Sequence, residues 1–172
     1  MLTDNNIANV IAQAELALLE IRELANNGPR FRIVHRFHRV GADCLPGEEV
    51  LAIFLLDKAQ EIPLLLSLSS RLVFNYLAEW RWVPQGATQI VTGIHVSPFY
   101  VRHGLNGGKL RRRKISRYCV KEYIKRIRRA LGIALASANL LIDPTRVLTS
   151  ESTTGNEVLY RLRAKVEWVH LD

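Results

Sequence analysis

The sequence predicts an α+β fold, because apolar residues follow a helical spacing in some segments and alternate with polar residues in others. Helical spacing is clearest in residues 7–25 and 115–139, and short apolar or alternating runs lie between and after these segments. The 172 residues are 48% hydrophobic and 23% charged, which is enough apolar chain for a buried core. We expect an amphipathic helix in residues 1–29 and a second domain in residues 30–172.

The composition argues against several classes of protein. The most apolar stretch, residues 50–56, ends at Asp57 and is shorter than the roughly 18 apolar residues that a membrane-spanning helix needs. The N-terminus has neither the basic region nor the apolar run of a signal peptide. Two cysteines, Cys44 and Cys119, are too few for a disulfide scaffold or a four-ligand zinc site. We therefore expect a soluble cytoplasmic protein with no membrane partner.

The first predicted helix carries a wide apolar stripe. Its apolar residues recur at spacings of four and three: Ile7, Ile11, Ala14, Leu18, Ile21 and Ala25. Residues 26–29, Asn-Asn-Gly-Pro, end the helix. About three heptads are short for an independent coiled coil, which favours packing on the protein's own core over a dimer interface.

Strands are predicted after this helix. Residues 31–40 alternate partly, and their two histidines, His35 and His38, have no carboxylate or thiol at ligand spacing, so we expect no metal site there. Residues 42–49 are predicted to form a loop. Two apolar runs, residues 51–56 and 62–66, are predicted to be strands joined by a short turn.

Two helices are predicted next. The first is capped by Ser67 or Ser69, runs to about Trp80 and buries a face that consists of Leu72, Val73, Tyr76 and Leu77. The second is short and covers residues 87–94. Residues 97–108 contain one proline and three glycines, which predicts a loop.

The longest predicted helix runs from Ile115 to about Asn139. One apolar seam follows its length at spacings of four and three: Val120, Ile124, Ile127, Leu131, Ala134 and Ala138. At 100° per residue, four cations fall within about 80° of one another beside this seam: Arg117, Lys121, Lys125 and Arg128. Lys114 joins them one turn earlier, and Tyr118 is close by. After a turn at residues 143–144, two predicted strands, residues 147–149 and 158–169, flank a polar hairpin tip in residues 150–157.

Positive charge is concentrated around this helix. Residues 102–130 hold twelve bases and one acid, so this window has a net charge of +11, whereas the whole chain has +8 and the remaining residues sum to −3. A solvated charged face usually carries interspersed acids. An excess of bases confined to one stretch is instead typical of a protein that binds a polyanion, and we favour nucleic acid.

The predicted order of elements is that of a winged helix-turn-helix, and the residues resemble one branch of it, the output domain of OmpR/PhoB-type response regulators. The resemblance covers about residues 51–164. It is carried by the leucine-rich segment 64–80, by Val147-Leu-Thr149 with Tyr160-Arg-Leu162 in the wing, and by matches in the recognition helix at Val120, Ile124, Arg126, Arg128, Leu131 and Gly132. We expect no receiver domain before the match, and the wing differs from the family pattern because the usual Arg-Gly is absent and the tip is longer.

The resemblance implies sequence-specific binding of double-stranded DNA by a transcriptional regulator. The long helix is expected to enter the major groove, and the hairpin tip to reach the neighbouring minor groove or backbone. Arg117, Tyr118 and Lys121 are expected at base edges. Phosphate contacts are expected from six other bases of the region: Arg111, Arg112, Arg113, Lys114, Lys125 and Arg128. Lys109 is also expected to contact DNA. From the tip, we expect contacts by Thr153, Thr154 and Asn156.

Other functions stay open on the sequence. An RNA-binding or ribonucleoprotein-assembly module could use the same basic helix, although only Tyr160 and Trp168 lie on the hairpin strands, and RNA readers usually display aromatics on a sheet. A third hypothesis is a protein-interaction adaptor whose basic helix binds an acidic partner. Catalysis is disfavoured because the chain has no nucleophile motif, no phosphate-binding loop motif and no obvious pair of acids for metal ions.

We further expect a homodimer to which the N-terminal helix contributes, because two linked units bind adjacent half-sites with high effective concentration. We expect no cofactor, no metal and no small-molecule ligand, and we expect the protein to be nucleoid-associated.

Overall fold

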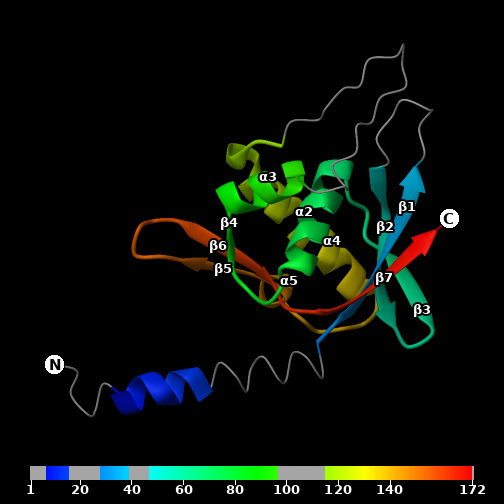
Figure 1. The fold of residues 1–172 in the computed structure, drawn as a ribbon. Coiled ribbons are helices and arrows are strands. Elements are labelled where there is room, and N and C mark those ends of the chain that lie inside the picture. The colour runs from blue at the N-terminus through cyan, green and yellow to red at the C-terminus, as the bar shows by residue number, and fades with distance from the viewer. Residues whose placement is uncertain (1–6, 16–27, 39–46, 97–114, 172) are drawn as a thin grey trace.

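The computed structural model describes residues 7–15, 28–38, 47–96 and 115–171 (Figure 1). Its fold is mixed α+β, with helices packed between two separate sheets. The fold class that the sequence predicts is therefore confirmed at this level.

The larger sheet has four strands in the order β3-β2-β1-β7. They are β1 (Arg30–His38), β2 (Gly47–Asp57), β3 (Gln60–Pro63) and β7 (Lys165–Leu171). β2 is antiparallel to β1 and β3, whereas β7 is parallel to β1. Alternate residues of β1 are fully buried, with Phe31 and Ile33 at 0% exposure, as expected for a sheet with one face on the core.

Arg32 lies on the other face of β1 and links three strands. Its guanidinium donates to Glu61 of β3 and, at 2.5 Å, to Glu167 of β7. The sheet is thus tied across its width by charge as well as by backbone hydrogen bonds.

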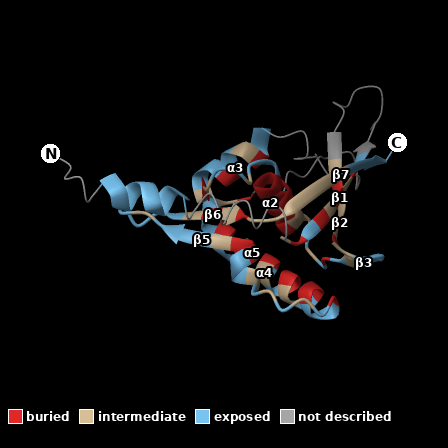
Figure 2. Ribbon diagram, turned by 90° about the horizontal axis from the view of Figure 1, so that it is seen from below, coloured by how far each residue is buried: buried red, intermediate tan, exposed pale blue. Residues whose placement is uncertain are grey.

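Helix α2 (Leu68–Glu79) forms the centre of the core. The Ser67 side chain caps it by accepting a hydrogen bond from the Ser70 N–H, and residues 72–78 are all buried. It contacts β2, α3 (Ala87–Val96) and α4 (Val120–Ser137). Figure 2 shows α2 as the most continuously buried helix.

The smaller sheet has three strands in the order β4-β6-β5. They are β4 (Gln85–Gly86), β5 (Leu148–Ser152) and β6 (Val158–Leu162). The β5–β6 hairpin projects beyond the helices (Figure 1), and β4 pairs with Leu159 and Tyr160 of β6, towards the tip of the hairpin. The segment between α2 and α3 thus holds the hairpin against the helical core.

The predicted seam of the long helix is confirmed. Its six residues, Val120, Ile124, Ile127, Leu131, Ala134 and Ala138, are between 0% and 8% exposed. The start of the helix differs from the prediction, because a 3₁₀ turn, η1 (Arg117–Cys119), precedes α4 and Ile115 lies buried outside both. Ser116 favours this turn by accepting a hydrogen bond from the Tyr118 N–H at 3.3 Å.

The prediction of one strand over residues 158–169 is wrong. The alternation continues through this segment, but the chain changes partners within it. The Arg163 N–H donates to Val147, whereas the Lys165 N–H donates to Pro29, so β6 ends at Leu162 and β7 begins in the other sheet. Val147 also differs from the prediction, because it ends a short helix, α5 (Pro144–Val147), that Asp143 caps.

The second strand of the predicted pair is shorter than expected, ending at Pro63, and the first begins earlier, at Gly47. The predicted loop over residues 97–108 lies outside the described residues, as do residues 39–46.

The N-terminal helix is confirmed for residues 7–15, and the rest of its predicted range lies outside the described residues. Its apolar side chains are exposed: Ile7 at 46%, Val10 at 63% and Ile11 at 53%. The expectation that this stripe packs on the protein's own core is therefore wrong for these residues.

Candidate nucleic-acid interface

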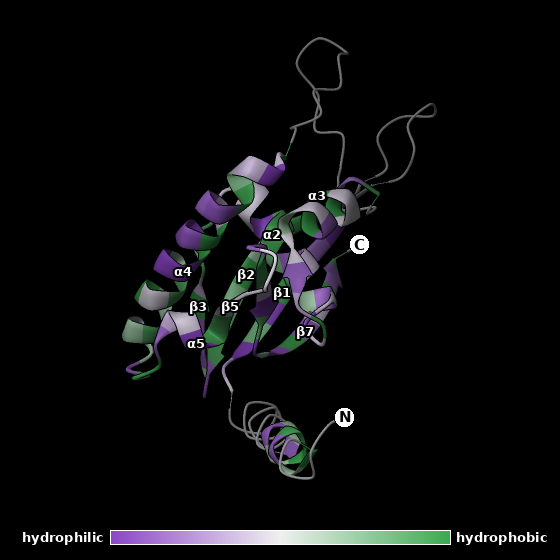
Figure 3. Ribbon diagram, turned by 90° about the vertical axis from the view of Figure 1, so that its left-hand side faces the viewer, coloured by the Kyte–Doolittle hydropathy of each residue, from purple (hydrophilic) through white to green (hydrophobic). Residues whose placement is uncertain are grey.

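The candidate interface consists of η1, the solvent side of α4 and the tip of the β5–β6 hairpin. Figure 3 shows hydrophilic residues along the outer side of α4. The structure describes eight of the residues predicted for DNA contact: Arg117, Tyr118, Lys121, Lys125, Arg128, Thr153, Thr154 and Asn156. The other five, Lys109, Arg111, Arg112, Arg113 and Lys114, lie outside the described residues.

The 3₁₀ turn presents a cation and an aromatic ring together. The Arg117 Nη2 donates to the Tyr118 hydroxyl at 2.7 Å, and the guanidinium carbon lies 4.8 Å from the ring centroid. This hydrogen bond raises the pKa of the Arg117 guanidinium above its ordinary value. Tyr118 is 78% exposed, so its flat ring faces solvent rather than the core.

The cations of α4 are not equivalent. Lys121 is exposed and has no ion pair within the described part of the chain. Lys125 is also exposed, but its Nζ donates to Glu122 Oε1 at 2.8 Å. This hydrogen bond lowers the pKa of the Glu122 carboxyl, so the carboxylate beside the lysine stays ionised to a lower pH than usual. The negative charge of Glu122 therefore offsets part of the positive charge that Lys125 contributes to the face.

Arg128 has structural partners that the sequence did not indicate. Its Nε donates to the Leu148 carbonyl at 2.9 Å, and its Nη2 donates to the Ser150 Oγ at 3.1 Å. Both acceptors are on β5, and the side chain is half-buried. Arg128 therefore attaches the hairpin to α4, so a phosphate contact by this residue stays a prediction.

The hairpin tip is closed by its own backbone. The Thr153 N–H donates to the Glu157 carbonyl at 2.8 Å, the Asn156 N–H donates to the Thr153 carbonyl at 3.1 Å, and Asn156 has a φ of 60°. Asparagine tolerates this left-handed conformation better than most residues. Thr154 and Asn156 are exposed, and Thr153 is half-buried.

The charge of the tip opposes its predicted role. Residues 150–158 contain two acids, Glu151 and Glu157, and no base. Glu151 has a cation near it, Arg163, at 3.7 Å. The predicted contacts between this tip and a phosphate backbone would rest on hydroxyl and amide groups, without help from positive charge.

Sequence reasoning missed the second attachment of the hairpin. The Arg161 Nε donates to the Arg81 carbonyl at 3.0 Å, and the Arg81 guanidinium lies 4.3 Å from the Trp82 ring centroid and 5.5 Å from that of Trp168. The adjacent Arg81-Trp82 pair in the sequence was the one available signal. The two arginines hold β6 to the segment that follows α2, as Arg128 holds β5 to α4.

His35 is a structural residue. It is 2% exposed, and its Nε2 lies 3.0 Å from the Asn75 Oδ1, which also accepts a hydrogen bond from Trp168 Nε1 at 3.3 Å. This network joins β1, α2 and β7. Among the described residues, no three histidines, cysteines or acids gather as metal ligands. None of the described helices combines the length and the apolar character needed to cross a membrane.

The chain matches no protein-family model, and it has no significant match among curated proteins or among solved structures.

Proposed function

We propose that this chain is a winged helix-turn-helix protein that binds double-stranded DNA at specific sequences and acts as a transcriptional regulator. The observation that carries the proposal is the asymmetry of α4. One side is fixed in the core by a seam that is at most 8% exposed, and the opposite side exposes cations to solvent.

This asymmetry suits a helix that enters the major groove. The groove is about 12 Å wide and accepts one α-helix, provided that the rest of the protein holds the helix rigidly and outwards. The buried contacts of Val120, Ile124 and Ile127 provide that support at the N-terminal half of α4, where the helix would meet base edges.

The arrangement around α4 also favours a winged helix. Helices α2 and α3 pack together before α4, and a hairpin follows it and is fixed to α4 through Arg128. In this proposal Arg117, Tyr118 and Lys121 contact base edges, Lys125 and the bases of residues 109–114 contact phosphates, and the hairpin tip contacts the backbone through Thr153, Thr154 and Asn156.

One observation favours the alternative of RNA binding. The exposed ring of Tyr118, with the Arg117 guanidinium beside it, is a surface on which an unpaired base could stack. Duplex DNA is preferred because the cations follow a helix rather than the surface of a sheet.

The test is a gel-shift comparison of random duplex DNA, single-stranded DNA and RNA at two salt concentrations. The proposal expects binding to duplex DNA that weakens steeply with salt, and enrichment of a motif from a random duplex pool. Binding to RNA alone, or to none of the three, would overturn it.

A matched pair of variants assigns the surface. Lys121→Gln removes a cation from the proposed interface, and Lys58→Gln removes an exposed cation from the turn between β2 and β3. Lys121→Gln should weaken binding to the selected duplex by about 1–3 kcal/mol if a base contact is lost, and Lys58→Gln should bind that duplex as the wild type does. Equal behaviour of the two variants would exclude Lys121 from the interface.

We also propose a homodimer to which the N-terminal helix contributes. The exposed apolar side chains of residues 7–15 support this proposal, because a soluble chain rarely leaves such a stripe in water without a partner.

A further inference from the structure

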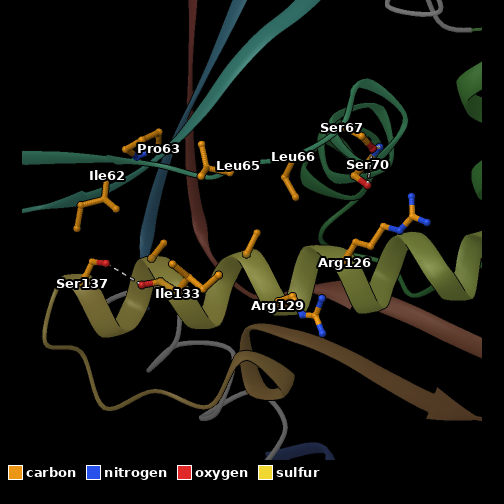
Figure 4. A pocket seen from close by; sticks show the side chains of 12 residues that line it. Ile62, Pro63, Leu65, Leu66, Ser67, Ser70, Arg126, Arg129, Ile133 and Ser137 are labelled. Carbon is orange, nitrogen blue, oxygen red and sulfur yellow. Dashed lines mark hydrogen bonds between the residues drawn. The ribbon is translucent and has the colours of Figure 1, made fainter.

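A groove of about 450 Å³ lies beside the second half of α4, on the opposite flank from the hairpin. Residues 62–67 and the first turn of α2 form one wall, and α4 from Arg126 to Ser137 forms the other (Figure 4). The floor and walls are mainly apolar, from Ile62, Leu66, Ala130 and Ala134.

The rim of the groove leaves large apolar side chains in solvent. Leu65 is 84% exposed on one wall and Ile133 is 62% exposed on the other. Exposed leucine and isoleucine facing each other across a cavity are typical of a surface that binds a partner.

The groove is also positively charged. Of the described residues that line it, Arg126 and Arg129 are cations and none is an acid, and neither guanidinium has an ion pair within the described residues. In Figure 4 the Arg126 side chain extends from α4 towards Ser70 at the start of α2. The groove therefore suits an occupant with an apolar face and acidic residues.

The same chain carries an element with this chemistry. In the N-terminal helix, Ile7, Val10 and Ile11 are spaced by three and four residues, so they form one apolar face, and all three are about half exposed or more. Residues 1–29 hold four acids (Asp4, Glu15, Glu20 and Glu23) and one base (Arg22). This segment is thus apolar on one face and acidic overall.

We propose that the N-terminal helix of one protomer docks in this groove of a second copy, and that the second copy docks its own helix in return. The inference rests on the proposed homodimer and names its acceptor surface. An amphipathic helix in an apolar groove is a common recognition mode, and a reciprocal exchange forms a closed pair.

A second copy is preferred over the same chain as the source of the helix. Within a single chain the apolar side chains of the helix remain exposed, as do Leu65 and Ile133 of the groove. Reciprocal docking of two chains covers the helix face and the groove of both chains, and it needs no third partner.

The test measures the molar mass of the full chain by light scattering over a range of concentrations. Val10→Glu alters the helix without lowering its helix propensity, and Ile133→Glu alters the groove. The control is Leu141→Glu, which replaces an exposed leucine outside the groove. We expect the wild type and the control to be dimers, and each of the other variants to dissociate about tenfold more readily or more, because a carboxylate would be buried in an apolar site.

Mixing the two disrupted variants tests the reciprocal geometry. A heterodimer of Val10→Glu and Ile133→Glu retains one intact helix and one intact groove that face each other, whereas neither homodimer retains any intact pair. The mixture should therefore recover dimers that neither variant forms alone. Circular dichroism of each variant checks that it is folded.

A monomeric wild type would overturn the inference, and so would a dimeric Ile133→Glu or a mixture that does not recover dimers. Gel shifts with random duplex DNA at high protein concentration separate this result from the proposed function. Folded monomeric variants should still bind duplex DNA weakly. A wild-type protein that forms the dimer but does not bind duplex DNA would refute the proposed function and leave the groove contact intact.

Discussion

Replacing Arg128 tests whether the hairpin is held to α4 by a single side chain. Arg128→Ala removes two hydrogen bonds at once, to the Leu148 carbonyl and to the Ser150 hydroxyl. Leu148 is 0% exposed, so its carbonyl has little access to water as a replacement donor. The hairpin should then rest on Arg161 and on its pairing with β4.

The magnitude follows from the two bonds. A hydrogen bond from a charged donor to a buried carbonyl contributes about 1.5–3 kcal/mol, and the bond to the exposed Ser150 adds less because water competes for it. We expect Arg128→Ala to lower the free energy of unfolding by about 2 kcal/mol. Arg128→Lys should recover only part of this, because an ammonium group cannot reproduce the two-donor geometry of the guanidinium.

The assay is urea unfolding, with amide hydrogen exchange to locate the change. Arg129→Ala is the control, because Arg129 is the neighbouring exposed arginine and has no hydrogen bond within the described residues. Exchange should rise in β5 and β6 for Arg128→Ala and stay unchanged in β1 and β2. If the free energies of unfolding of the two alanine variants differ by less than about 0.5 kcal/mol, Arg128 does not anchor the hairpin. If Arg128→Ala instead reduces the salt slope of DNA binding by about one unit, the residue contacts a phosphate directly.

Three further changes probe the core and the charged face. Ile124→Ala should lower the free energy of unfolding by about 2–5 kcal/mol in urea titrations, because Ile124 is 1% exposed; a loss below 1 kcal/mol would contradict its burial. Gly93→Ala should cost about 1–3 kcal/mol in the same titrations, since its Cβ would lie 2.1 Å from the Tyr76 ring; an unchanged midpoint would show that the ring moves aside freely. Glu122→Gln should tighten binding to every duplex at neutral pH, because the Glu122 carboxylate that pairs with Lys125 and offsets its charge is removed. Gel shifts that show weaker binding would count against a phosphate contact at this face.

The elements that the sequence predicted well are those determined by local pattern. The seam of α4 repeats every three or four residues for five intervals, so both its helical state and its buried side were readable. Ser67 as a cap and the turn between β2 and β3 follow from residue types at fixed positions.

What the sequence could not indicate depends on distant partners. β6 and β7 share one alternating pattern, and only their different neighbours, β5 and β1, divide them. β4 has two residues, too few to form a pattern, and it is a strand because β6 lies beside it.

The same reason applies to the candidate site. Arg117 and Tyr118 are adjacent in the chain, so their closeness could be predicted from the sequence. The acceptors of Arg128 lie 20 or more residues away on β5, so the sequence made Arg128 look like one more free cation. The groove beside Arg126 and Arg129 likewise needs residues 62–67 to be brought against α4.

The parallel pairing of β1 with β7 has a consequence for the order in which the protein folds during synthesis. Arg32 and Glu167, which face each other across these strands, are 135 residues apart in the chain. β1 leaves the ribosome early and can pair with β2 at once, but its other edge stays open until residues 165–171 follow. For most of translation the nascent chain thus presents an unpaired strand edge, the feature that most readily recruits other chains into aggregates. Three arginines on this strand, at positions 30, 32 and 36, supply charge that discourages such pairing until β7 covers the edge.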